Sequence, residues 1–441
     1  RTSWSVAKRS IQLSYRRKQL NKNLYKKLIY ITLMLNNSKD NVIKNVLLFI
    51  RMSKNYYRKE IDGLRAVAIL PVVLYHTYSF SFAKGGFLGV DIFFVISGFL
   101  ITNILLDEIS LTNKISLINF YNRRVRRIIP ALFFVTLMCI YPAYKLLFPI
   151  TFKEFGQSLM GVSTLIPNLI FLIQGGYFGE PESLKPLLHT WSLGVEEQFY
   201  FFFPLFLIIF WKVLKRKILF VISILFFFSL IIADDLSNGS YFRENFFLPF
   251  TRMWEFLAGA FISYYNFFLK KKNLKLFEKN LLSVLGVFLL IYSFLILGKY
   301  PHPSFLTAIP VLGTCLIILF GTGETFIGKF LSWKYIVGIG LISYSLYLWH
   351  VPIFVFARHY NFMSNLEGNN YYLSSTKYFF LIAIVFAMSY FSWKYIEQPF
   401  RQKKIFKDNL KKKKISDRNL IKLCIISFLI IFFSGYLINK N

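Results

Sequence analysis

The chain has 441 residues, of which 55% are hydrophobic and 20% aromatic, and its formal net charge is +32. This composition excludes a soluble globular protein, because too much apolar surface would face water. The charge does not indicate nucleic-acid binding, since Lys and Arg form short clusters between apolar runs rather than one basic domain. Cys139, Cys315 and Cys424 lie within apolar runs without metal-ligand spacing, so we expect no bound metal. These features predict a membrane protein.

Eleven apolar runs are candidates for membrane-spanning helices, because about 20 apolar residues cross a hydrocarbon core. In chain order they cover residues 64–82, 87–106, 128–148, 198–211, 218–233, 249–268, 280–297, 304–320, 336–357, 377–396 and 420–437. We therefore expect an all-α polytopic membrane protein with a ten-helix core and an eleventh helix. A weaker run at 155–173 is interrupted by Gly156, Gly161 and Pro167.

Basic residues between the runs indicate which loops face the cytoplasm, because cytoplasmic loops are enriched in Lys and Arg. With a cytoplasmic N-terminus, the basic clusters at 123–127, 270–272 and 411–414 all lie inside. This arrangement holds only if the run 155–173 does not cross the membrane. We therefore predict a multi-pass protein in which residues 155–173 form an extracytoplasmic, membrane-dipping segment.

The domain boundaries follow from the distribution of basic and apolar residues. Residues 1–51 begin with Arg and are strongly basic, and we interpret them as an N-terminal extension that is not native, with Met52 as a more natural start. We expect the main membrane domain at 52–401 and a basic cytoplasmic linker at 402–419. The eleventh helix and the C-terminus then occupy 420–441.

Ionisable residues inside the runs are candidates for function, because each costs about 2.5 to 3.5 kcal/mol to insert into a membrane. Arg65 and His76 are eleven residues apart, which is three helical turns plus about 20°, so both side chains point the same way. We expect Arg65 at the cytoplasmic mouth of a groove and His76 about 16 Å deeper. His76 is then a candidate general base or acyl acceptor. The alternative is a histidine that only bonds to a neighbouring helix.

The segment 123–127 places four arginines at the inner end of the third run. Arg124 and Arg127 can clamp phosphate groups, since the planar guanidinium matches phosphate oxygens. The same cluster can also act only as a topology anchor, and the sequence leaves both interpretations open.

A histidine and two adjacent carboxylates are expected at the outer mouth of the fourth run. They are His189, Glu196 and Glu197. Adjacent like charges disfavour each other's ionisation, so the two glutamates are candidates for catalysis.

Two later runs also carry polar residues. Arg252 and Glu255 are three residues apart and can pair on one helix face. Such a pair is as consistent with a structural role as with catalysis. His350 lies in the outer half of the ninth run, whereas His302 and His359 are expected in outer loops and without a role.

Seven segments contain most of these residues, in order along residues 57–401, and His76 follows Arg65 of the first segment as an Arg-x10-His pair. They are 58–66 (RKEIDGLRA), 88–99 (LGVDIFFVISGF), 124–131 (RVRRIIPA), 189–200 (HTWSLGVEEQFY), 252–259 (RMWEFLAG), 344–352 (YSLYLWHVP) and 395–401 (YIEQPFR). Any one segment is weak evidence, but the ordered set closely resembles the membrane-bound acyltransferase-3 family of bacterial O-acyltransferases.

The resemblance implies an enzyme of the bacterial inner membrane that moves an acyl group, usually acetyl, from cytosolic acyl-CoA. The implied acceptor is a hydroxyl of an envelope polysaccharide such as lipopolysaccharide O-antigen or peptidoglycan, or of a lipid-linked sugar. Acetyl-CoA is thus the expected donor, and no metal is expected.

The resemblance also assigns roles to residues. Arg65 and His76 become the essential pair, and Arg124 and Arg127 become an element of the CoA side. Our own hypothesis adds Arg65 to the CoA side and takes Glu196 and Glu197 as further catalytic candidates. It places His189, Arg252, Glu255 and His350 on the substrate side.

Many members of the family continue past an eleventh helix into an extracytoplasmic SGNH hydrolase-like domain. We therefore expect either a separate SGNH-domain protein as a partner or the loss of that domain. Two alternatives stay open: a secondary transporter that uses the buried charges as an ion relay, and an inactive remnant of a truncated fused acyltransferase.

Overall fold

The computed structural model describes residues 57–77, 84–175, 181–214, 217–268, 274–364, 373–401 and 417–440. The chain divides into two units, residues 1–57 and 58–441, and every described helix belongs to the second. The interpretation of residues 1–51, and that of residues 402–416 in the expected linker, lies outside the described residues.

Each of the eleven apolar runs overlaps a helix, although residues 78–82 of the first run lie outside the described part of the chain. The described residues contain no strand. The helices are α3 (Lys59–Tyr75), α4 (Gly89–Thr112), α5 (Leu117–Leu146), α8 (Thr190–Leu214), α9 (Ile218–Asp235), α11 (Pro249–Phe268), α12 (Leu276–Ile296), α13 (Ala308–Phe320), α15 (Lys334–Ser364), α16 (Ser375–Ser392) and α18 (Asp417–Lys440). Short helices connect them: α6 (Pro149–Ser163), α7 (Pro167–Ile173), α10 (Phe242–Phe247), α14 (Phe326–Leu331) and α17 (Gln398–Arg401).

Among the described residues, eight helices are long and apolar enough to cross a membrane, and the chain is an all-α polytopic membrane protein. The other three of the eleven are α3, α11 and α13. The first has 17 residues and the last has 13, whereas α11 has 20 residues but carries a buried ion pair. Neighbouring helices, rather than lipid, surround the polar groups of α11, because these groups are fully buried.

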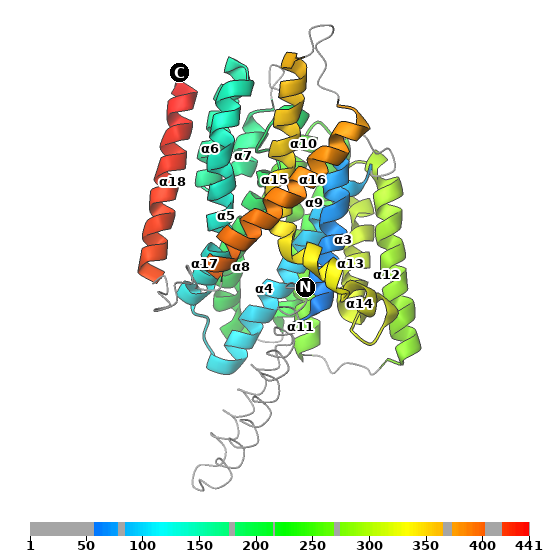
Figure 1. The fold of residues 1–441 in the computed structure, drawn as a ribbon. Helices are drawn as coiled ribbons and strands as arrows, with labels where there is room; N and C mark the ends of the chain where they lie inside the picture. Colours follow the sequence, from blue (N-terminus) through cyan, green and yellow to red (C-terminus); the bar gives the residue numbers. More distant parts are fainter. Residues whose placement is uncertain are drawn as a thin grey trace, which may run out of the picture. The chain divides into compact units, whose positions relative to one another are not determined.

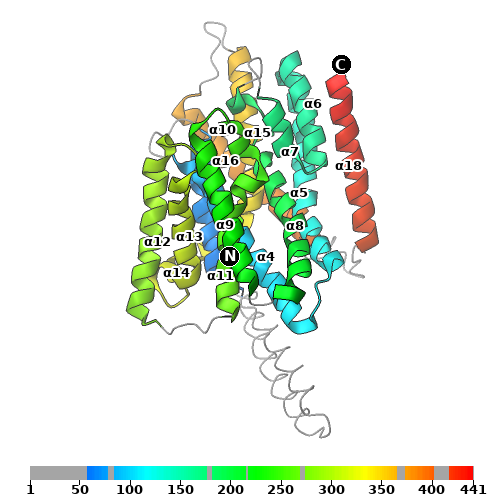
Figure 2. The same ribbon diagram turned by 180° about the vertical axis from the view of Figure 1, so that it is seen from behind.

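Figures 1 and 2 show the long helices side by side, with consecutive ones running in alternate directions. The starts of α3, α5, α9, α12 and α15 thus lie at one end of the bundle. We call it the basic end because its loops and helix starts carry the residues Lys114, Arg123, Lys217, Lys275, Lys279, Lys329 and Lys334. We call the other end of the helix bundle the opposite end.

The run 155–173 folds as a helical hairpin made of α6 and α7. The chain reverses at Leu165, which adopts a positive φ of 60°. The Gln174 side chain donates to the carbonyl of Glu154 at 2.8 Å and to the Gln157 side chain at 3.0 Å, which shows that the two helices are antiparallel. The run therefore does not cross as one helix, in agreement with the loop charges. Its extracytoplasmic location stays a prediction.

Close packing at glycines brings the polar residues of different helices together. A Cβ at Gly98 of α4 would collide with the carbonyl of Phe256 on α11, and a Cβ at Gly340 of α15 would collide with the carbonyl of Asp62 on α3. Small residues allow such backbone approach in membrane bundles. The first contact sets α4 against α11, and the second sets α3 against α15.

Candidate active site

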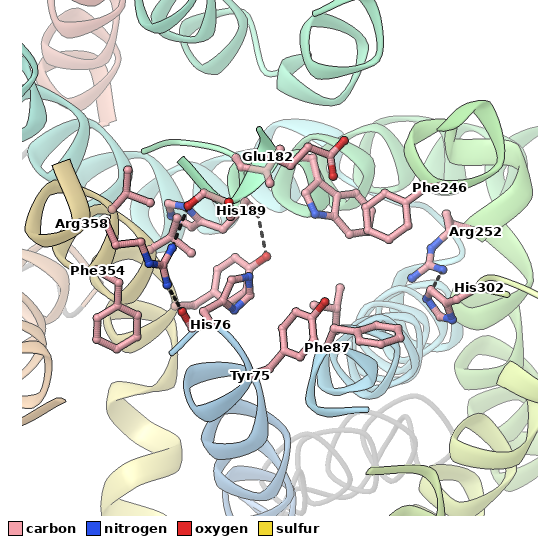
Figure 3. A pocket seen from close by; sticks show the side chains of 17 residues that line it. Tyr75, His76, Phe87, Glu182, His189, Phe246, Arg252, His302, Phe354 and Arg358 are labelled. Carbon is pink, nitrogen blue, oxygen red and sulfur yellow. Dashed lines mark hydrogen bonds between the residues drawn. The ribbon is translucent and has the colours of Figure 1, made fainter. Parts of the chain in front are cut away.

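A cavity of about 240 Å³ opens between the ends of several helices. We call it the histidine cavity; its polar wall includes His76, His189, Arg252, His302 and Arg358. Figure 3 shows that His76, His189 and Arg358 lie at one end of this cavity and that Arg252 and His302 lie at the other. The aromatic side chains of Tyr75 and Phe87 lie between the two ends, and Trp191 and Phe246 also line the cavity.

His76 follows the last residue of α3, and its ring is only partly buried. The distance from its Nδ1 atom to the carbonyl oxygen of Val72 is 2.9 Å. A carbonyl can only accept a hydrogen bond, so Nδ1 carries the proton and Nε2 of the neutral ring does not. The ring therefore has the tautomer and the exposure that a base or a nucleophile needs.

Three histidine rings meet around this end of the cavity. The ring centroids of His76 and His350 are 5.0 Å apart, and those of His189 and His350 are 5.6 Å apart. His350 is fully buried and does not line the cavity, so it lies behind the other two rings. The three histidines that the sequence assigned to the site thus lie together, and the substrate-side role of His350 stays a prediction.

His189 lies one residue before α8 and lines the cavity. Neither of its ring nitrogens makes a well-formed hydrogen bond with another described residue. Burial, and next the neighbouring His76, lower the pKa of His189 to about 3. The ring is therefore neutral near pH 7 and can bind a polar group of a substrate.

The far end of the cavity holds a buried charged cluster around Arg252. This guanidinium forms salt bridges with Asp91 at 3.0 Å and with Glu255 at 3.3 Å, and it lies 2.7 Å from Nε2 of His302. The guanidinium carbon also lies 5.5 to 5.9 Å from the ring centroids of Phe94, Trp191 and Phe246. The predicted pairing of Arg252 with Glu255 is present, and both carboxylates compensate the buried cation.

His302 lies in the expected loop, and its ring lines the cavity and contacts Arg252. The loop position expected for His359 was wrong. His359 lies inside α15, because this helix continues to Ser364. The sequence analysis did not identify Asp91 as the partner of Arg252. The position of this carboxylate inside an apolar run could have indicated a functional or paired residue.

A second, smaller cavity of about 70 Å³ lies next to the first. We call it the arginine cavity; its polar wall includes Arg65, Arg127, Ser97 and Glu196. Both cavities have Val90 and Tyr347 in their walls. The hydroxyl of Tyr347 lies 2.7 Å from the Ser192 hydroxyl and donates to the His189 carbonyl at 2.7 Å. Tyr347 therefore separates the two cavities.

The arginines of the arginine cavity differ in their partners. Arg65 donates to Asp62 at 2.7 Å on its own helix. Arg127 makes no hydrogen bond or salt bridge with any other residue in the described part of the chain. Arg124 does not line the cavity; its guanidinium lies 5.8 Å from the ring centroid of Tyr200 and 5.9 Å from that of Phe120. Arg65 and Arg127 are thus together in one cavity, and Arg124 lies outside its wall.

The two glutamates of α8 lie away from the outer mouth where they were expected. Glu196 accepts hydrogen bonds from Ser97 and Tyr200 in the arginine cavity, whereas His189 lines the other cavity. The reason is geometric: α8 begins at Thr190, so Glu196 lies about 9 Å further along the helix axis. Glu197 is half-buried and lines neither cavity.

No group of three potential metal ligands occurs among the described residues. The side chains of the two cavities offer acid–base, nucleophilic and electrostatic chemistry. Arg65 and Arg127 lie on one side of Tyr347, and His76, His189 and His302 lie on the other together with Arg252 and Arg358.

Residues 58–394 match a family model described as an acyltransferase domain, and they include the residues that line both cavities. The chain belongs to the acyltransferase-3 family. It is similar to the O-acetyltransferase OatA of Staphylococcus aureus strains MRSA252 and NCTC 8325, with 31% identity over 404 residues in each case. These alignments cover 88% of this chain and 65% of OatA.

A further relative, from Staphylococcus aureus strain MSSA476, is 32% identical over 370 residues, which are 81% of this chain and 59% of the relative. The chain therefore spans about two thirds, or less, of the length of these relatives. No solved structure matches the chain.

Proposed function

We propose that this chain is a membrane O-acetyltransferase that carries an acetyl group from acetyl-CoA to a hydroxyl group of an envelope polysaccharide. One observation carries the proposal: on one side of Tyr347 lies the guanidinium of Arg127, which forms no salt bridge with any described residue, and on the other lies the unprotonated Nε2 of His76. The cationic guanidinium suits the phosphates of an anionic donor, and the unprotonated ring nitrogen suits the reacting acyl group. The names of the OatA relatives support the same reaction type.

The proposed orientation places the basic end in the cytoplasm. The loops at this end carry the Lys and Arg residues that the positive-inside rule assigns to the cytoplasmic face. The N-terminus is then cytoplasmic, and the α6–α7 hairpin is extracytoplasmic. The membrane is the bacterial inner membrane, where acetyl-CoA is available on one face and envelope polysaccharide on the other.

The donor enters from the basic end in this account. Its phosphates bind the guanidinium of Arg127 in a bidentate manner, and Arg65 adds charge beside them. Arg124 contributes its positive field from outside the cavity wall. The pantetheine arm then extends past Tyr347 and brings the thioester to His76.

Two routes lead from the thioester to the product. In the first, Nε2 of His76 attacks the acyl carbon, the C–S bond breaks, and the acyl-imidazole then passes its acyl group to the acceptor hydroxyl. In the second, Nε2 takes the hydroxyl proton while the hydroxyl oxygen attacks the acyl carbon, and the C–S bond breaks to release the CoA thiolate. In both routes the hydroxyl proton ends on the CoA thiolate, so an ester and free CoA form.

The acceptor binds in the histidine cavity from the opposite end. The neutral ring of His189 can hydrogen-bond a hydroxyl, and Trp191 and Phe87, which line the same cavity, offer apolar faces for a sugar ring. We propose a lipopolysaccharide, peptidoglycan or lipid-linked sugar as the source of this hydroxyl. A separate SGNH-domain protein is a further proposed partner, which takes the acetyl group on to the final polysaccharide.

The test uses the full chain in two settings. Purified protein in lipid vesicles is supplied with radiolabelled acetyl-CoA, and release of free CoA is measured. In cells, alkali-labile acetyl esters on the envelope polysaccharide are measured with and without a co-expressed SGNH domain. Acetyl esters that appear only with the active chain support the proposal. Absence of both CoA release and esters, in well-folded protein, contradicts it.

A further inference from the structure

A buried arginine outside the family-like segments contacts the main chain of His76. Arg358 lies on α15, eight residues after His350 and about 12 Å further along the helix axis. Its side chain is 5% exposed, and it lines the histidine cavity. Arginines are rarely so buried unless several of their donors are bonded.

The Arg358 guanidinium bonds to three separate segments of the chain. Its Nε donates to the Tyr378 hydroxyl of α16 at 3.0 Å. One terminal nitrogen donates to the Ser183 carbonyl at 2.7 Å, and the other donates to the His76 carbonyl. Figure 3 shows the last two bonds as two dashed lines that leave the Arg358 guanidinium in different directions.

The bond to His76 completes the end of α3. The last carbonyls of a helix lack partners within the helix, and a basic side chain can satisfy them. The Nδ1 atom of His76 is bonded to the Val72 carbonyl of the same helix end. Fixing the main chain at His76 therefore also fixes the direction in which its Nε2 atom points.

The bond to Ser183 joins this helix end to the loop that precedes α8. We call residues 181–189 the cavity loop; Glu182, Ser183, Leu188 and His189 line the histidine cavity. The cavity loop carries His189 at its end, and Ser183 lies close to its start. One guanidinium therefore holds the two segments that carry His76 and His189.

We propose that Arg358 is a positioning residue of the acyl-transfer site, which holds the main chain of His76 against the cavity loop that carries His189. The inference rests on the proposed function of His76. Its physical basis is preorganisation, since a misplacement of about 1 Å at a reacting group can cost about 100-fold in rate.

A matched control lies on the other side of the same loop. Arg243 on α10 forms a salt bridge with Glu182 at 2.7 Å and donates to the Phe171 carbonyl at 2.8 Å. It holds the cavity loop without bonding to α3. A residue that serves only to hold the loop should therefore behave like Arg243.

The experiment compares Arg358→Gln and Arg358→Lys with Arg243→Gln in the full chain, reconstituted in lipid vesicles. We expect Arg358→Gln to lower the turnover of acetyl-CoA about 100-fold while leaving its KM unchanged, because the donor phosphates bind in the other cavity. Arg358→Lys keeps the charge and one donor group, so its turnover should lie between those of Arg358→Gln and the unmodified chain. Arg243→Gln, which removes a partly exposed ion pair, should stay within about fivefold.

Amide hydrogen exchange provides a readout that does not depend on activity. Arg358→Gln should accelerate exchange at residues 74–77 and in the cavity loop, whereas Arg243→Gln should accelerate it in the loop alone. Tyr378→Phe removes one hydrogen bond of Arg358 and leaves α3 unchanged, so it replaces Arg358→Gln if that variant does not fold. Tyr378→Phe should lower turnover less than Arg358→Lys does. It should also slightly accelerate amide exchange at residues 74–77.

The outcomes separate this inference from the proposed function. Unchanged exchange at residues 74–77 in Arg358→Gln, or equal losses in Arg358→Gln and Arg243→Gln, would overturn the positioning role. Faster exchange at 74–77 with full turnover would also overturn it. If instead His76 itself proves dispensable for turnover, the proposed function fails, and the exchange pattern still shows whether Arg358 anchors α3.

Discussion

The imidazole rings of His76 and His350 meet edge to face, with centroids 5.0 Å apart and an angle of 72° between their planes. His350 belongs to α15 and also contacts the ring of His189. Because His350 is fully buried, it fills the space behind two rings that face the cavity. Its shape therefore matters for the placement of both.

The first prediction separates the shape of His350 from its chemistry. His350→Ala should destabilise the protein by about 3 kcal/mol, since it leaves a void beside His76 and His189, and it should lower acetyl transfer strongly. His350→Phe refills the void and should keep transfer within about tenfold of the unmodified chain, because volume-conserving changes are tolerated best. Melting temperature and acetyl transfer are measured together. If Phe is as damaging as Ala in folded protein, the ring nitrogen is needed and the supporting role is wrong.

The second prediction concerns the donor phosphates. Arg127→Gln should weaken binding of CoA about 10- to 100-fold, since a bond between charged groups contributes about 1.5 to 3 kcal/mol. Arg123→Gln is the matched control from the same cluster, because its side chain is 48% exposed and pairs with Glu108. Binding is measured by titration calorimetry at two salt concentrations. Equal weakening by both variants would show a diffuse field instead of a phosphate site.

The third prediction concerns sidedness. Single cysteines at Lys114, Ser240 or Glu324, in a chain whose native cysteines are replaced by Ala, report the face of each loop. Ser240→Cys should react with an impermeant maleimide on intact cells, because it is exposed at the opposite end. Lys114→Cys and Glu324→Cys should react only after permeabilisation. These two positions flank the α6–α7 hairpin in sequence, so labelling of one but not the other would mean that the hairpin crosses.

The fourth prediction concerns pH and His302, whose loop lies between α12 and α13. Burial, and next the charge of Arg252, hold the pKa of His302 well below its ordinary value. The unfolded chain takes up a proton near pH 6.5 and the folded one does not, so stability falls as the pH drops below about 6.5, by at most about 1.4 kcal/mol per pH unit. The melting temperature should therefore drop between pH 7.5 and pH 5. His302→Gln should show a smaller drop, and an equal drop would contradict this assignment.

The sequence predicted the helices well because most of the apolar runs are close to the length that a membrane demands. The shortest run, 198–211, belongs to a longer helix that begins at Thr190. Loop charges also showed correctly that the run 155–173 does not cross as a single helix. The hairpin itself was not predictable, since the reversal at Leu165 depends on contacts such as those of Gln174 with α6. Helix α15 also ran further than expected, which moved His359 from a loop into a helix.

The contents of the site were predicted in part. Periodicity within α3 placed Arg65 and His76 on a common side, and each lines a cavity. Pairings between distant helices, such as Asp91 with Arg252, were out of reach because the period of one helix does not show which helix packs against it. The separation of Glu196 from His189 likewise depends on where α8 begins.

The central claim is that His76 carries the acetyl group or the proton during transfer, and one measurement tests it most directly. Transfer of radiolabelled acetyl from acetyl-CoA to envelope polysaccharide is compared in membranes that contain the unmodified chain, His76→Gln or the control His359→Gln at equal protein levels. We expect His76→Gln to lose about 100- to 10,000-fold, the range for removing a general base, whereas His359→Gln keeps its activity. Transfer by His76→Gln at the rate of the control would contradict the account.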